Sequence, residues 1–149
     1  TIGKLLHDKG SDVWATKPAT SVSEALKLMA EKDIGVLLVM DGDALVGILS
    51  ERDCARKVTL PGKNASEIPV SEIMTARVLY VRADQSVEAC MALMTEKHIR
   101  HLPVLGGDDR VIGVVSMGDV GRAIIADQEF TIAHLEHYIT GSESMLYRS

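Results

Sequence analysis

The sequence contains little of what several classes of protein require. Aromatic residues make up 3% of its 149 positions, so the core has to be built from aliphatic side chains and methionine. Two cysteines, Cys54 and Cys90, are too few for a disulfide framework. The formal net charge of −5 argues against a general nucleic-acid binder. These shortages leave an acidic globular protein with an aliphatic core.

Long apolar runs are missing too. The longest stretches, such as IGVLLVM at 34–40, are far too short to span a bilayer. No charged segment followed by an apolar one opens the sequence, as a secretory leader would. We therefore expect a cytoplasmic protein that binds neither a membrane nor nucleic acid.

The usual markers of catalysis are absent as well. No serine or cysteine has a histidine at a spacing that indicates an activated nucleophile, and no Gly-rich phosphate loop of the Walker or dinucleotide type occurs. His134 and His137 lie three residues apart on a predicted helix, but no acidic or cysteine ligand completes a metal site with them. We predict that the protein is not an enzyme and holds no catalytic cofactor or metal.

What the sequence does contain is an internal repeat. Residues 21–39, SVSEALKLMAEKDIGVLLV, align at an offset of 65 with residues 86–104, SVEACMALMTEKHIRHLPV, and nine of the nineteen positions are identical. After one additional residue in the second copy, the match resumes in a shared Gly-x-x-Ser-x-x-Asp motif. The motif occupies Gly47, Ser50 and Asp53 in the first copy and Gly113, Ser116 and Asp119 in the second. We interpret the chain as a tandem duplication of a unit of about 65 residues.

Each unit has the pattern β-α-β-β-α. In the first unit, an apolar stripe with helical spacing follows Ser21, the expected N-cap, and the helix should end near Asp33. Apolar runs at 35–40 and 44–50 predict two strands, which we expect to be antiparallel because their connection is short. A short extended piece at 12–16 precedes these elements, and a helix follows them. The second unit repeats this order.

The fold class expected from this pattern is α+β, with two units packed by a pseudo-twofold axis into one module. A single unit buries too little surface to be stable alone. We place the first unit, with the N-terminal helix and the linker, at 1–66, the second unit at 67–125 and a C-terminal helical tail at 126–149. Ile132, Leu135 and Ile139 share one helix face, so the tail could fold back on its own unit or pack on a second copy.

The Ser-x-x-Asp part of the motif has two interpretations. Serine is a preferred helix N-cap, and an aspartate in the first turn complements the helix dipole, so the motif can be a structural cap. The same position suits a nucleotide. Free N–H groups and a hydroxyl can bind phosphate there, and an ionised carboxylate can accept from both hydroxyls of a ribose. The preceding glycine lets the chain approach the strand closely. The residues alone leave both interpretations open.

The doubled β-α-β-β-α unit, EKHIRHLPVL at 96–105 and the doubled Gly-x-x-Ser-x-x-Asp resemble a pair of CBS domains, named after cystathionine β-synthase. The resemblance covers about Lys9 to Ile125. It implies a regulatory module that binds AMP, ADP, ATP or NAD(H), with S-adenosylmethionine less favoured, in two clefts between the units. It also implies a homodimer, for which we favour the C-terminal tail as the self-association surface, and a regulated protein partner that the sequence does not identify.

In the CBS family each cleft is built by both units, and the resemblance carries this arrangement over to particular residues. One cleft would use Asp12, Val13, Trp14, Ile34 and Gly35, closed by Arg100, Ser116 and Asp119. The other would use Arg77, Val78, Leu79, Ile99 and Arg100, with the neighbouring His101, closed by Gly35, Ser50, Arg52 and Asp53. Because the basic residues gather near Asp53, we expect that cleft to prefer the more highly charged ligand, although a solvated basic face would give the same pattern.

Two other functions stay open beside the sensor. One is a nucleotide- or NAD-dependent enzyme, which the missing catalytic groups disfavour. The other is a DNA-binding regulator, which the acidic balance and the lack of a separate helix-turn-helix segment disfavour.

Overall fold

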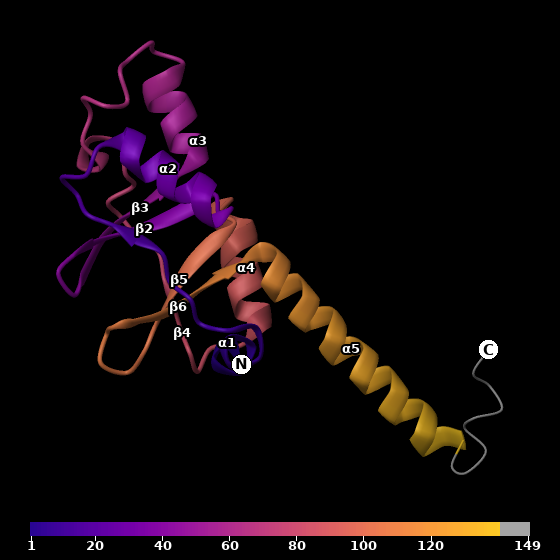
Figure 1. Cartoon of the computed structure of the whole chain (residues 1–149). Coiled ribbons are helices and arrows are strands. Elements are labelled where there is room, and N and C mark those ends of the chain that lie inside the picture. The colour runs from indigo at the N-terminus through magenta and orange to yellow at the C-terminus, as the bar shows by residue number, and fades with distance from the viewer. Residues whose placement is uncertain (141–149) are drawn as a thin grey trace.

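The computed structural model describes residues 1–140, with side chains described up to residue 135 (Figure 1). The helices are α1 (Ile2–Lys9), α2 (Val22–Lys32), α3 (Glu51–Cys54), α4 (Val87–Lys97) and α5 (Met117–Thr140), with a π-helical turn η1 (Ala55–Thr59) after α3 and a 3-10 turn η2 (Val70–Glu72). The strands are β1 (Ala15–Thr16), β2 (Val36–Asp41), β3 (Ala44–Ser50), β4 (Val81–Arg82), β5 (His101–Leu105) and β6 (Val111–Ser116).

The strands form two three-stranded sheets with the same order, β1-β2-β3 and β4-β5-β6. In each sheet the first pair is parallel and the second is antiparallel. The register shifts between Val39 and Met40 in β2 and between Val104 and Leu105 in β5, positions that the repeat relates by an offset of 65. The α+β class and the two similar units are therefore confirmed.

The central helix of each unit is limited by local backbone chemistry at both ends. The Ser21 and Ser86 hydroxyls accept hydrogen bonds from the N–H groups of Glu24 and Ala89, at 3.2 and 3.0 Å, as N-caps do. Asp33 and His98 end the two helices in the left-handed conformation, with φ of 53° and 55°. These two turns deliver the chain directly to the start of β2 and β5.

The N-terminal helix α1 packs in the core of the second unit, although the first unit follows it directly in the chain. Ile2, Leu5 and Leu6 of α1 are buried with side chains of α4, β5 and β6, and the Ile2 N–H donates to the Gln85 carbonyl at 2.9 Å. The sequence analysis grouped this helix with the first unit because of its position in the chain. Its apolar face covers the second unit instead.

The reverse exchange completes the first unit. Val70 and Ile73 lie in the linker segment before β4, which the predicted bounds counted with the second unit at 67–125. Both side chains are buried in the core formed by α2, β2 and β3. Two residues after Ile73 the chain pairs with β3, since Thr75 and Ile48 exchange two backbone hydrogen bonds of 2.9 and 3.0 Å. Each core therefore includes a short segment that the predicted bounds assigned to the other unit.

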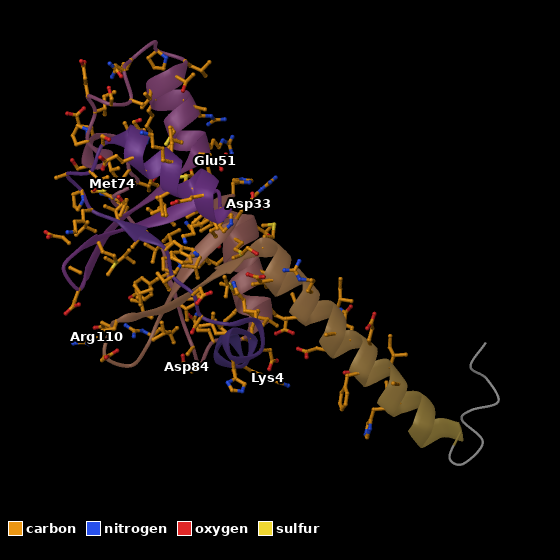
Figure 2. All side chains as sticks on the ribbon, in the orientation of Figure 1. Lys4, Asp33, Glu51, Met74, Asp84 and Arg110 are labelled. Carbon is orange, nitrogen blue, oxygen red and sulfur yellow. The ribbon has the colours of Figure 1, made fainter. Side chains whose placement is uncertain are left out.

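The glycine of each repeated motif allows this exchange. A Cβ built on Gly113 would lie 2.7 Å from the Leu6 side chain, and one on Gly47 would lie 3.2 Å from the Thr75 carbonyl oxygen and closer still to the Met74 side chain. Figure 2 labels Met74 on the first unit. The expected close approach is therefore present in both units, since the linker packs directly on Gly47 of β3 and α1 packs directly on Gly113 of β6.

Helix α5 is one continuous helix rather than a short helix followed by a separate tail. Its first turns pack on the second core through Val120, Ala123 and Ile124, and the rest extends away from the body (Figure 1). Over 126–135 it does not fold back, and Ile132 and Leu135 are 56% and 52% exposed. The side chain of Ile139, assigned to the same face, lies outside the described residues. Within 1–140 no helix is both long and apolar enough to cross a bilayer.

The packing of α1 predicts a large difference between two leucine truncations. Leu6→Ala should lower the free energy of unfolding by about 2–4 kcal/mol, because it empties a buried site in the second core. Leu60→Ala makes the same chemical change where the side chain is 79% exposed and should cost less than about 0.5 kcal/mol. Chemical denaturation of both variants measures the difference, and equal costs would contradict the assignment of α1 to the core.

Candidate functional site

Two cavities lie where the two units meet. The larger has a volume of about 490 Å³, and we call it the Asp53 cleft. The smaller, of about 350 Å³, is the Asp119 cleft. Both volumes fall within the range of roughly 300–1,000 Å³ that is typical of small-molecule sites. His101 at the start of β5 lines both cavities, as do Gly35 and Val36 at the start of β2.

All of the residues assigned to the first of these cavities line it. They are Arg77, Val78, Leu79, Ile99, Arg100, Gly35, Ser50, Arg52 and Asp53, together with His101. Five further residues line the cleft and were not assigned to it from the sequence: Val36, Ile48, Thr75, His98 and Leu102. Ile48 could have been found by strand alternation, because it lies two residues before Ser50 on the same face of β3. Thr75 could not, because its place depends on the packing of the linker against β3.

The structure brings most of the other assigned set together. Asp12, Trp14, Ile34, Gly35, Ser116 and Asp119 line the Asp119 cleft. Val13 and Arg100 are not among the residues that line it, and Arg100 lines the Asp53 cleft. Lys9 and Asp33 also line the Asp119 cleft, although the sequence analysis did not assign them there. Lys9 was missed because α1 was grouped with the first unit, whereas its side chains pack in the second core.

In the Asp53 cleft the serine and aspartate cap each other at the start of α3. The Ser50 hydroxyl accepts from the Asp53 N–H at 3.1 Å, and Asp53 Oδ2 accepts from the Ser50 N–H and hydroxyl at 3.3 and 3.0 Å. The Lys57 ammonium lies 3.5 Å from the other oxygen, Oδ1, and donates to the Ile73 carbonyl at 2.9 Å. The structural cap is therefore real, and it uses mainly one oxygen of the carboxylate.

In the Asp119 cleft both carboxylate oxygens hold strong donors. Oδ2 accepts from the Ser116 N–H at 2.9 Å and from the Lys9 ammonium at 2.8 Å, while Oδ1 accepts from the Arg122 guanidinium at 2.8 Å. Burial by itself would raise the pKa of Asp119, but the hydrogen bonds from Lys9 and Ser116 outweigh it and hold the pKa below its ordinary value. This carboxylate is more fully engaged than that of Asp53.

The helix N–H groups that could bind a phosphate are partly used. The first N–H of α3, from Glu51, donates to the Gly35 carbonyl at 3.0 Å, and the first N–H of α5, from Met117, donates to the Arg100 carbonyl at 2.7 Å. These bonds tie each helix start to the beginning of the neighbouring strand. Since these N–H groups are already bonded, a phosphate in either cleft would be neutralised mainly by charged side chains.

The charged side chains of the two clefts differ in sign. Arg52, Arg77 and Arg100 line the Asp53 cleft, where Asp53 is the single acidic residue among those lining it. The Asp119 cleft holds three acidic residues, Asp12, Asp33 and Asp119, against Lys9. The first cleft therefore favours an anion, and the second does not.

His101 stands in the wall that the two clefts share. Burial lowers its pKa from the ordinary value, and the opposing effect of Asp119 is smaller. A histidine whose pKa lies below 6.5 is mainly neutral at pH 7, so it adds hydrogen-bonding capacity but little charge to either cleft.

Comparisons with known proteins agree with this architecture. The family model described as "CBS domain" matches residues 10–59 and 70–126. The mitochondrial CBS domain-containing protein CBSX3 of Arabidopsis thaliana is 37% identical over 151 residues, covering 95% of this chain and 72% of that protein. A solved CBS-domain structure from Burkholderia ambifaria is 49% identical with a TM-score of 0.80, covering 86% of this chain and 96% of the other.

One solved relative carries a ligand. The crystal structure of CBSX2 in complex with AMP is 30% identical to this chain, with a TM-score of 0.70. It covers 86% of this chain and 98% of the other. A similar protein of almost the same extent therefore binds an adenine nucleotide.

The hydrogen bonds of Asp119 predict a pH-dependent contribution to stability. Because the folded-state pKa is below the ordinary value, the stabilisation is present above that value and is lost as the pH falls through the folded pKa. Asp119→Asn should lower the free energy of unfolding at pH 7 by about 1–3 kcal/mol. Parent and variant should converge as the pH falls below 3.8. Denaturation of both proteins from pH 7 to pH 3 measures this, and a constant difference would contradict it.

Proposed function

We propose that this chain, which belongs to the CBS domain family, is a regulatory module that binds an adenine nucleotide in the Asp53 cleft. The observation that carries the proposal is the composition of this cleft. It combines three arginines with the Ser50–Asp53 turn in a volume of about 490 Å³, and the two sides come from different units. The AMP complex of the relative CBSX2 supports the same class of ligand.

The cleft has a separate surface for each part of a nucleotide. Val78, Leu79 and Ile99 offer aliphatic contact for a base, in a protein with few aromatic residues. The carboxylate of Asp53 has an oxygen that can accept from the two hydroxyls of a ribose.

The three arginines decide among the adenine ligands. Each guanidinium can form paired, charge-assisted hydrogen bonds with phosphate oxygens, so Arg52, Arg77 and Arg100 favour AMP, ADP and ATP in order of increasing charge. NAD(H) carries two phosphates and stays compatible with this cleft. S-adenosylmethionine carries a positive sulfonium instead and is disfavoured by the same three charges.

We further propose that the chain self-associates through the extended part of α5. Ile125, Ile132 and Leu135 lie on one side of the helix and are all more than half exposed. An apolar face of this kind on a helix that leaves the body is stabilised by contact with a second copy.

The surface of α5 predicts a change of assembly without a change of fold. Ile132→Glu combined with Leu135→Glu should weaken self-association at least about tenfold, because it places charges in an apolar contact. Thermal stability of the monomeric unit should stay the same, since both side chains are exposed. Sedimentation over a concentration series measures the effect. A monomeric parent protein, or an unchanged association constant, would refute the proposal.

The ribose contact predicts the effect of one substitution on affinity. Asp53→Ala should weaken binding of AMP and ATP by about 30- to 1000-fold, or about 2–4 kcal/mol, because it removes the acceptor for the ribose hydroxyls. Asp84→Ala is the matched control, since Asp84 (labelled in Figure 2) is exposed, lies on a turn and lines neither cavity. Isothermal titration calorimetry with both nucleotides measures the difference.

A purely structural role for Asp53 makes a different prediction. If Ser50 and Asp53 act as a helix cap and nothing more, the variant should lose thermal stability but keep its nucleotide affinity. Asp53→Asn keeps the size of the side chain and should show the affinity loss with less destabilisation, so the two effects can be separated.

A further inference from the structure

The two clefts differ in how their carboxylates are occupied. Asp119 Oδ2 accepts from the Lys9 ammonium at 2.8 Å, whereas the lysine nearest to Asp53 lies 3.5 Å from Oδ1 and donates elsewhere. The repeated motif is the same in both units, so this difference does not come from Ser-x-x-Asp. It comes from the segment that packs beside the motif in each unit, which is α1 at Asp119 and the linker before β4 at Asp53.

Lys9 lines the Asp119 cleft and makes two hydrogen bonds there, with 35% of its side chain exposed. It is the last residue of α1, which packs on the second core, and its ammonium donates to the Val114 carbonyl at 2.8 Å as well as to Asp119. Val114 lines the same cleft. Two of the three N–H donors of the ammonium are therefore bonded to Val114 and Asp119, on the side of the cleft where a ribose would have to bind.

We infer that Lys9 takes the place of a ribose diol on Asp119 and thereby determines that the Asp53 cleft is the one that fills first with nucleotide. This inference rests on the proposed function, and it names the residue that makes the two sites unequal. A nucleoside entering the Asp119 cleft would have to displace the ammonium from both acceptors before its hydroxyls could reach the carboxylate.

The surroundings do not compensate for displacing the lysine. Asp12 and Asp33 add two acidic groups to the cleft, so removing the ammonium from Asp119 would leave three carboxylates facing an incoming phosphate. Arg122 would stay paired with Oδ1, but its side chain is 73% exposed and its charge is screened by water. By contrast, the linker places Thr75 in the Asp53 cleft, and the Thr75 side chain carries no charge.

A different role for Lys9 would leave a different signature. If Lys9 moved to bind a phosphate, its loss would weaken binding of AMP more than of adenosine, which has no phosphate. If it blocks the ribose, its loss should improve binding of adenosine, which probes the diol without the phosphate.

The single tryptophan of the chain offers a reporter for the second cleft. Trp14 lines the Asp119 cleft and not the Asp53 cleft, and its side chain is 39% exposed. Fluorescence of Trp14 therefore reports filling of the Asp119 cleft, while calorimetry counts both clefts together.

The experiment compares the full-length parent with Lys9→Met, using adenosine and AMP as probes. In the parent, calorimetry should show binding at concentrations that leave Trp14 fluorescence unchanged. In Lys9→Met, a fluorescence-detected site should appear for adenosine at concentrations at least about tenfold lower than in the parent. Adding Asp119→Ala to Lys9→Met should abolish that gain, because it removes the exposed acceptor.

Two control variants separate the contact from general effects of charge and stability. Lys4→Met removes the same charge from an exposed position on the same helix and should behave as the parent (Figure 2). Lys9→Arg keeps a cation at the position and should leave the cleft closed. Circular dichroism and denaturation of each variant show whether it is folded, and Lys9→Gln replaces Lys9→Met if the latter is unstable.

Three results would overturn the inference. They are equal filling of both clefts in the parent, no gain of adenosine binding in Lys9→Met, and a loss of AMP binding larger than any change for adenosine. Absence of nucleotide binding at either cleft in the parent would instead overturn the proposed function, and this inference with it.

Discussion

The exchange of covering segments between the two units is the constraint on which the rest of the structure depends. Ile2 and Leu6 close the core of the second unit, while Val70 and Ile73 close that of the first. Burial of these apolar side chains stabilises each core and at the same time joins the two units. The clefts lie at the junction, so their shape depends on the same packing that holds the cores together.

This exchange also explains why two copies of one motif produce different sites. The chemistry repeated in both units is the Ser-x-x-Asp turn, which acts as a helix cap in each. The side chains brought from the exchanged segments are not repeated, because α1 supplies Lys9 and the linker supplies Thr75. The two units therefore share the hydrogen bonds within the motif, but the residue that packs beside the motif differs between them.

Much of the fold could be predicted because the repeat and the periodicity are local signals. The strand at 44–50 agrees with β3, and the helix ending near Asp33 agrees with α2. Within the extended piece predicted at 12–16, β1 pairs with β2 over two residues, Ala15 and Thr16. The placement of α1 could not be predicted, because an apolar stripe shows that a helix is covered but not by which core. Lys9 was missed in the site for that reason.

Helix α5 begins at the turn that contains Ser116 and Asp119, and it has 24 residues. At 1.5 Å per residue it is about 36 Å long. A tilt of about 5° at its first turn would therefore move its far end by about 3 Å, on the same geometry. The contact of Lys9 with Asp119 lies in the first turn of α5. A change of this contact that tilts the helix slightly would therefore produce a larger displacement at the end of α5 that extends away from the body (Figure 1).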